Sequence, residues 1–444
     1  MSEKRAPGAP ETDGFGAWTW IALVVIFCAS LYSDVSRFIN PDGEKYMPGY
    51  FRGGQMDFSY PYLGARAWLA GENPYTTPAP EFTHKVFEPT NIHGKLYKQL
   101  YPPGHLLTLI PLALIYGSDS VGAGRLFFEI SLVALAGLGL VTWSLLQSAR
   151  GQMVSPLFIF PAVTAFLLFP GAQLGLERGH ADILTALLCW GALALLMRRV
   201  VAPALFLVVW AVNIKGYPLL FAAGLALLML RSRAWRPALL GALLGAVVFV
   251  APAARFLGDA FRGTIYRSSM FEPVWFNHGF KNVVHNVLSP GVSDRGRLVL
   301  SALALAVTAL WGWRAWQRRH ELAGPDGALA LIMFGTASLL AMVGLSSLSI
   351  SYNLSLVVPG VLLLATCQDR VVARMRIGRA GGHLLGAVTT ACGFMLFLCR
   401  WGPTFPLAGL GLVVLLATLG LLGVRMPAPR ASAAAPEPAG PEAV

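Results

Sequence analysis

Residues 181–230 read ADILTALLCWGALALLMRRVVAPALFLVVWAVNIKGYPLLFAAGLALLML. The stretch contains three apolar runs, at about 181–197, 200–214 and 217–230. An arginine pair separates the first two runs, and a short polar link with one lysine separates the second from the third. A helix that crosses a bilayer needs about 20 mostly apolar residues, with a range of about 17–25. The stretch therefore predicts three membrane helices, of which the last two are short.

Apolar runs of similar length recur along the whole chain, which predicts an all-α polytopic membrane protein with about 12 transmembrane helices. We expect one integral-membrane domain over 17–424, flanked by a cytoplasmic tail at 1–16 and a disordered cytoplasmic tail at 425–444. No small-residue cleavage site follows the first run, so we interpret it as a retained span and not as a signal peptide. The other runs lie at about 17–33, 122–147, 153–170, 236–256, 297–316, 328–345, 350–367, 383–400 and 405–424.

The composition excludes several other classes of protein. Of the 444 residues, 55% are hydrophobic and 13% are charged, whereas soluble proteins carry charge on about a quarter of their residues. An ordinary soluble enzyme, a disordered protein and a coiled coil are therefore excluded. The five cysteines lie in or beside apolar runs, form no CxxC pair and are expected to be small buried hydrophobes. They are Cys28, Cys189, Cys367, Cys392 and Cys399.

The net charge is +12, and many of the basic residues lie in short clusters between apolar runs. This is the pattern of cytoplasmic loops in membrane proteins and not of a surface that binds nucleic acid. The clusters are Arg198-Arg199, Arg231/Arg233/Arg236, Arg314/Arg318/Arg319 and Arg370/Arg374/Arg376/Arg379.

Residues 104–117 form an ambiguous run, because it has only 14 residues and contains Pro111. If this run does not cross the membrane, every basic cluster lies in the cytoplasm. We therefore interpret it as a re-entrant or interfacial helix, with both chain termini cytoplasmic. Two long polar segments, about 33–103 and 257–296, then lie on the outer side, and loops of this length usually have a function.

Asp57 is the first candidate for chemistry. It lies in the first outer segment, just before a predicted interfacial helix at Tyr60–Ala70. A carboxylate there could accept the proton of a hydroxyl nucleophile. It could equally cap the amino end of the helix.

Two more charged groups lie between apolar runs. Glu177, Arg178, His180 and Asp182 occur within LGLERGHADIL, where they could face a cavity or simply neutralise each other within the loop. Lys215 could extend to the membrane surface, or it could hold a lipid phosphate. One histidine with two carboxylates is a weak metal signal, so we predict no metal site.

The second outer segment contains VWFNHGFKNVVHNVL, with Asn277, His278 and Lys281. Its polar and cationic side chains fit sugar or phosphate binding, or else an amphipathic interfacial helix. The loop SSLSISYN, from Ser346 to Asn353, is polar without an assigned role. There is no P-loop, DxD or HExxH motif, which disfavours an ATP-driven pump and a cytoplasmic nucleotide-sugar enzyme.

An ordered set of these motifs resembles glycosyltransferase family 87, a member of the C-type (GT-C) superfamily of integral-membrane transferases. The set is an acid in the first outer loop, YLGARAWLAGENPY, YPPGHLLTLIPL, a Gly-polar pair that opens a span, and IKGYPLLF. The resemblance extends over about 17–424. Gly179-His180 and Asn277-His278-Gly279 depart from the patterns that relatives have at these places. The departures concern the identity of the donor or the acceptor more than the type of reaction.

The resemblance implies a GT-C-like helical bundle in the plasma (inner) membrane. It implies transfer of a hexose, typically mannose, from a polyprenyl-phosphate-sugar donor to a lipid or glycan acceptor on the outer face. Asp57 matches the catalytic base of relatives, and Lys215 matches a recurrent lysine. One inverting displacement needs one carboxylate base and cations for the leaving phosphate, so no cofactor is expected. The substrate-binding candidates are Lys215, His180, Arg66, Asn277, His278, Lys281 and Tyr62.

Two other classes of function stay open from the residues alone. One is a polytopic transporter or lipid-linked-glycan flippase, since ionisable residues near spans often mark a substrate path. The other is a non-catalytic scaffold, which would tolerate substitution of Asp57. Transport would move a substrate without forming a new glycosidic bond, and that difference separates it from transfer.

Overall fold

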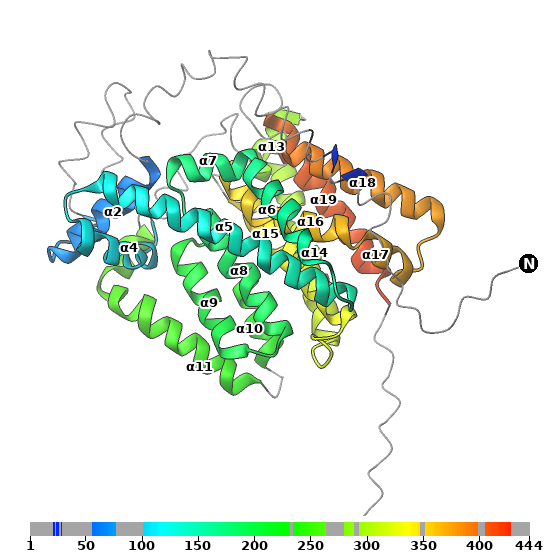
Figure 1. The fold of residues 1–444 in the computed structure, drawn as a ribbon, viewed down its shortest axis with the longest axis horizontal. Helices are drawn as coiled ribbons and strands as arrows, with labels where there is room; N and C mark the ends of the chain where they lie inside the picture. Colours follow the sequence, from blue (N-terminus) through cyan, green and yellow to red (C-terminus); the bar gives the residue numbers. More distant parts are fainter. Residues whose placement is uncertain are drawn as a thin grey trace, which may run out of the picture.

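The structure is a computed structural model that describes residues 21, 22, 24, 25, 28, 56–76, 101–230, 234–262, 279–287, 293–346, 351–397 and 405–427. Over these residues it consists of helices joined by short connections, with no strand (Figure 1). Among the described residues, six helices are long and apolar enough to cross a membrane, or seven if one bent pair counts as one span. The predicted all-α polytopic membrane fold is confirmed. The number of crossings stays a prediction, because several of the other apolar helices are short.

The helices follow the apolar runs of the sequence. The run at 17–33 lies mostly outside the described residues. The helices used below are α2 (Met56–Leu69), α4 (Pro103–Tyr116), α5 (Ser120–Arg150), α6 (Ile159–Leu168), α7 (Pro170–Arg178), α8 (Asp182–Met197), α9 (Val201–Ile214), α10 (Leu219–Leu230), α11 (Trp235–Gly245), α13 (Phe280–Val287), α14 (Ser293–Gln317), α15 (Pro325–Leu345), η7 (Ser351–Leu356), α16 (Val358–Thr366), α17 (Gln368–Arg374), α18 (Arg379–Phe397) and α19 (Phe405–Arg425).

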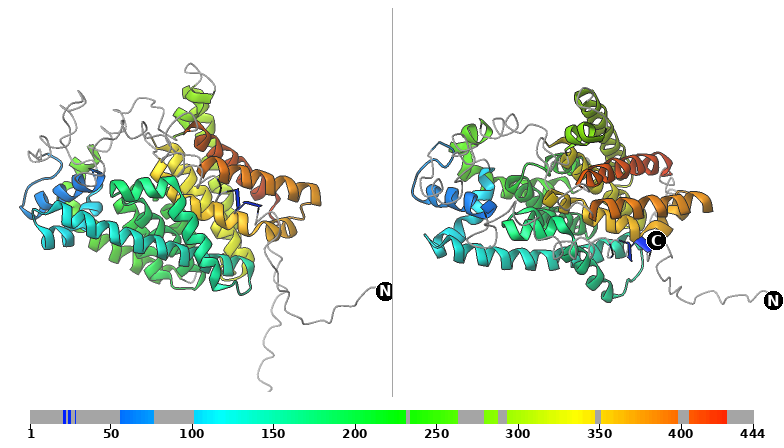
Figure 2. Two further views of the ribbon diagram at one scale, coloured as in Figure 1. Left: turned by 45° about the horizontal axis from the view of Figure 1, so that its top comes forward. Right: turned by 90° about the horizontal axis from the view of Figure 1, so that it is seen from above.

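Helix α15 is the centre of the bundle. In its most apolar window 89% of the residues are buried, and it packs against α5, α8, α10, α14, α16 and α19. Figures 1 and 2 show it between the green helices and the orange and red ones. Small residues allow this packing. At Gly360 a Cβ atom would lie 2.2 Å from Thr336 Oγ1, so α16 contacts α15 at a distance that only glycine permits.

The run predicted as one span over 153–170 is helical over Pro156–Leu168 and ends at a sharp bend. Pro156–Leu168 and Pro170–Leu176 are two helical segments that meet at an angle of 70°. Phe169, which precedes Pro170, has an extended backbone, because a residue before proline avoids the helical conformation. Because of this bend, α7 does not continue in the direction of α6 and instead packs against η7.

Helix α2 begins at Met56, four residues before the predicted start at Tyr60. The ring of Phe58 is buried and stacks on that of Tyr62, with 5.3 Å between their centroids, which extends the packed part of the helix. Asp57 therefore lies inside the first turn of α2 and does not precede the helix. Pro61 lacks the N–H that would bond to the carbonyl group of Asp57, so this turn has one helical hydrogen bond fewer.

Helix α4 packs against α2, α5 and α9. With 14 residues it is about 21 Å long, shorter than the roughly 30 Å hydrocarbon layer. That it does not cross the membrane stays a prediction. At Gly104 a Cβ atom would lie 2.3 Å from the Cβ of Asn213. Glycine at this position thus lets the beginning of α4 reach the last turn of α9.

Helices extend into both ends of the polar segment 257–296. The helix that starts at Trp235 continues to Arg262 through a π turn at Ala246–Val250, and α14 begins at Ser293. Between them lies α13. Asp259 accepts a hydrogen bond from Asn73 at 2.9 Å, which fixes this end of the helix to the turn after α2.

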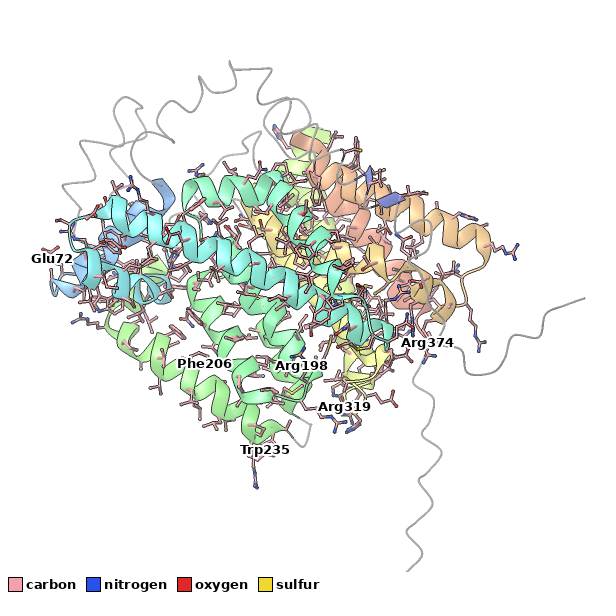
Figure 3. The ribbon with its side chains drawn as sticks, viewed as in Figure 1. Glu72, Arg198, Phe206, Trp235, Arg319 and Arg374 are labelled. Atoms are coloured by element: carbon pink, nitrogen blue, oxygen red, sulfur yellow. The ribbon has the colours of Figure 1, made fainter. Side chains whose placement is uncertain are left out.

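Arginines from three of the four basic clusters lie toward one end of the bundle. Figure 3 labels Arg198 and Arg319 in the lower middle of its view and Arg374 to the right, while Figure 1, in the same orientation, labels α7 in the upper part. Helix α8 connects the two ends, because Asp182 begins it and Arg198 follows its last residue. Its 16 residues span about 24 Å. Asp182 and the arginine clusters are therefore on opposite sides of the molecule.

Candidate active site

Three charged or titratable side chains meet at the end of the bundle opposite the arginines. The Nζ of Lys215 lies 2.9 and 3.0 Å from the two carboxylate oxygens of Asp182. It also lies 2.9 Å from Nδ1 of His180. The same imidazole nitrogen contacts Asp182 directly. The result is a compact Lys–Asp–His cluster.

Local sequence brings these three residues together. Helix α7 ends at Arg178 and is capped by Gly179, whose φ of 67° is the left-handed conformation that glycine adopts without strain. The chain then turns into α8 at Asp182. Helix α9 runs back from the arginine end and finishes at Ile214. The next residue, Lys215, has an extended backbone. Two consecutive helices with a short connection thus place His180, Asp182 and Lys215 at one end.

The cluster is buried. Asp182 is 0% exposed, His180 3% and Lys215 6%. A buried charge is tolerated only when it is paired and hydrogen-bonded. Asp182 satisfies this condition by pairing with Lys215, which lies 33 residues further along the chain. The charges of the loop therefore do not simply neutralise each other, as one interpretation of the sequence allowed. Lys215 is enclosed and paired inside the bundle, whereas a lysine that extends to the surface, which was the alternative interpretation, would be exposed.

A third segment completes the cluster and was not assigned from the sequence. Asn353, at the end of SSLSISYN, accepts a hydrogen bond from Lys215 at 3.4 Å through Oδ1. Its Nδ2 donates to the hydroxyl of Tyr217 at 3.1 Å. The ammonium of Lys215 lies 5.2 Å from the centre of the Tyr217 ring. The polarity of SSLSISYN was the only available signal for this contribution.

Tyr101 connects the cluster to α4 and α2. Its ring meets that of His105 edge-on, with 4.8 Å between the centroids, and lies 6.2 Å from the ring of His180. It also lies 6.2 Å from the ring of Tyr60 on α2. Tyr75 donates from its hydroxyl to the backbone oxygen of Tyr101 at 2.9 Å. The first turn of α2, which contains Asp57, is thereby linked to the cluster through one aromatic residue.

The remaining candidates are placed as follows. Tyr62 is fully buried, and its hydroxyl donates a hydrogen bond to the backbone oxygen of Gly117 at 2.9 Å. This hydroxyl therefore links α2 to the residue after α4. Arg66 is half-buried near the end of α2. Lys281 belongs to α13, as expected of a helical segment. The side chains of Asp57, Glu177 and Lys281 and all of Asn277 and His278 lie outside the described residues.

No group of three or more His, Cys, Asp or Glu side chains with the arrangement of a metal site occurs among the described residues. Three of the cysteines, Cys189, Cys367 and Cys392, are buried in the bundle, which confirms their prediction as core residues. Cys28 is exposed.

Comparison with known proteins gives one match. The family model described as glycosyltransferase family 87 matches residues 100–342, more than half of the chain. The matched region contains His105, His180, Asp182 and Lys215, whereas Asp57 precedes it and Asn353 follows it. No curated protein and no solved structure matches the chain.

Proposed function

Because the chain belongs to glycosyltransferase family 87 and is a membrane glycosyltransferase, we propose that it transfers a hexose, in the first instance mannose, from a polyprenyl-phosphate donor. The acceptor is a lipid or glycan hydroxyl on the outer face of the plasma membrane. The reaction is one inverting displacement. Asp57 is its base, and the Lys215 cluster binds the donor phosphate.

The observation that carries the proposal is the buried lysine. A cation in a largely apolar bundle strengthens any bond to an anion, because the surrounding dielectric constant is low. Asp182 keeps Lys215 paired while the site holds no donor. On donor binding, a phosphate oxygen replaces the bond from Lys215 to Asn353 Oδ1, which is 3.4 Å long. Asn353 keeps its bond to Tyr217.

The proposed step balances with the groups at hand. The acceptor oxygen forms a bond to the anomeric carbon while the bond from that carbon to the phosphate oxygen breaks. The electron pair of the broken bond stays on the phosphate, next to Lys215. The acceptor proton moves to the carboxylate of Asp57. The products are the glycosylated acceptor and polyprenyl phosphate.

The charge distribution supports an outer-face site. Loops rich in arginine stay in the cytoplasm, and the arginine clusters lie at the end of α8 that is opposite Asp182. The cluster then faces the outer leaflet. A lipid-linked donor can enter there laterally, with its polyprenyl chain still in the bilayer.

A transfer assay tests the proposal. Membranes with matched amounts of wild type, Asp57→Asn or Glu72→Gln are given labelled polyprenyl-phosphate mannose and an acceptor lipid extract. Glu72 is an exposed acid just after α2 and serves as the matched control. We expect label in new glycolipid or polymer with wild type and Glu72→Gln, and a loss of at least about 100-fold with Asp57→Asn.

Equal transfer by wild type and Asp57→Asn would remove Asp57 as the base. Movement of label across the membrane without a new glycosidic bond would contradict the proposal and favour a flippase. If mannose is not transferred but another polyprenyl-phosphate sugar is, the choice of mannose is wrong and the reaction type stands.

A further inference from the structure

His105 is a buried histidine that the proposed mechanism does not use. It is the third residue of α4, after Pro103 and Gly104, and only 2% of it is exposed. Within the described part of the chain its Nδ1 has no hydrogen-bond partner. Buried polar atoms in folded proteins nearly always have one. An imidazole nitrogen without a partner at the edge of a candidate active site points to a bond that a ligand supplies.

The position of His105 fits this interpretation. Its ring packs edge-on against Tyr101, and the ring of Tyr101 lies 6.2 Å from that of His180. Gly104, the residue before it, touches Asn213, two residues before Lys215. His105 therefore belongs to the same site as the Lys215 cluster and approaches it from another helix.

The beginning of α4 favours an anion as the ligand. The amino end of a helix carries a partial positive charge and N–H groups without helical partners. Helix α4 has 14 residues and no acidic side chain in its first turn. Together with Lys215, this end of α4 provides a positive environment for an anion. In it, the neutral imidazole of His105 would donate a hydrogen bond from Nδ1–H to the ligand. A phosphate oxygen fits such a donor better than a sugar hydroxyl does.

We propose that His105 is a donor-binding residue whose Nδ1–H donates a hydrogen bond to a phosphate oxygen of the lipid-linked sugar. This inference rests on the proposed function. It adds a second contact to the donor phosphate. Helix α4 supplies one contact through His105, and the Lys215 cluster, at the ends of α8 and α9, supplies the other.

Three substitutions separate this role from packing. In His105→Asn the side-chain amide can occupy the place of Nδ1, whereas in His105→Gln it reaches the place of Nε2. His105→Phe keeps a ring without either nitrogen. Each variant is purified in nanodiscs, and its dissociation constants are measured for a short-chain polyprenyl-phosphate mannose, polyprenyl phosphate and inorganic phosphate. Melting temperature and the KM for the acceptor are recorded alongside.

We expect His105→Asn to bind the donor within about threefold of wild type, and His105→Gln and His105→Phe to bind about 10- to 100-fold more weakly. The loss should be equal for the donor and polyprenyl phosphate, since both carry the phosphate, and competition by inorganic phosphate should weaken in parallel. The KM for the acceptor should not change.

Wild-type affinity in His105→Phe would overturn the inference, and so would a loss confined to the sugar-bearing donor. If His105→Phe does not fold, the comparison of Asn with Gln decides, and equal binding by these two would contradict a role for Nδ1. A wild-type protein that binds no polyprenyl-phosphate sugar would instead contradict the proposed function itself.

Discussion

At the scale of single residues, the main feature is the pairing of Lys215 with Asp182. Both side chains are almost fully buried and lie 2.9 Å apart. When one partner of a buried pair is removed, the other charge is left without compensation, which costs about 3–5 kcal/mol. When both are replaced by apolar groups of similar size, stability is often unchanged. This difference separates the structural role of the pair from its role in transfer.

We predict that Lys215→Met and Asp182→Leu each lower the free energy of unfolding by about 3–5 kcal/mol. The double variant should recover most of that loss. Transfer should nevertheless stay at least about 100-fold below wild type in the double variant, because the phosphate has lost its cation. Melting temperature in detergent and the initial rate of transfer check the two parts. A double variant that is both stable and active would show that Lys215 has only a structural role.

The residues of this cluster differ in how far the sequence could predict them. His180, Asp182 and Lys215 were candidates because ionisable groups between apolar runs are rare and need partners. Asn353 was not, because it joins Lys215 from 138 residues away and a neutral amide leaves no such signal. The same holds for His105, whose significance depends on burial and on a missing partner. Neither property can be seen in a sequence.

At the scale of helices, the contact between α4 and α9 determines where His105 and Lys215 lie relative to each other. The contact depends on Gly104, and a second bond supports it, since Trp210 Nε1 donates to Thr108 Oγ1 at 2.9 Å. The apolar runs predicted these helices within a few residues. They ended one run at Pro170, where the bend lies, but they did not predict that α7 continues from there as a separate helix, because PGAQLGLER is too short and too polar to stand out as an apolar run.

We predict that Gly104→Ala displaces the beginning of α4, because the new methyl group would lie 2.3 Å from the Cβ of Asn213 and 2.8 Å from its backbone oxygen. The expected loss of stability is about 1–3 kcal/mol, and transfer should fall with it. Gly258→Ala is the matched control, since nothing lies within 4 Å of a Cβ atom at that position. Melting curves and transfer rates of the two variants test this. A Gly104→Ala protein as stable and active as Gly258→Ala would contradict the close approach.

At the scale of the whole molecule, the arginine end and the cluster end define an orientation in the membrane. Glu72 and His320 are both exposed, the first near α2 and the second in the loop after α14. We predict that a membrane-impermeant maleimide labels Glu72→Cys in intact cells and labels His320→Cys only after the membrane is opened. Both are made in a variant whose native cysteines are replaced. The reverse pattern would place the cluster in the cytoplasm.

In the proposed reaction, one base and one phosphate-binding cluster carry out a single displacement on a lipid-linked sugar. This displacement is tested most directly with purified protein, a polyprenyl-phosphate sugar of defined anomeric configuration, and NMR of the products. We predict a glycosylated acceptor with the opposite anomeric configuration, together with an equimolar amount of polyprenyl phosphate. A product that retains the configuration of the donor, or one formed without release of polyprenyl phosphate, would contradict the account.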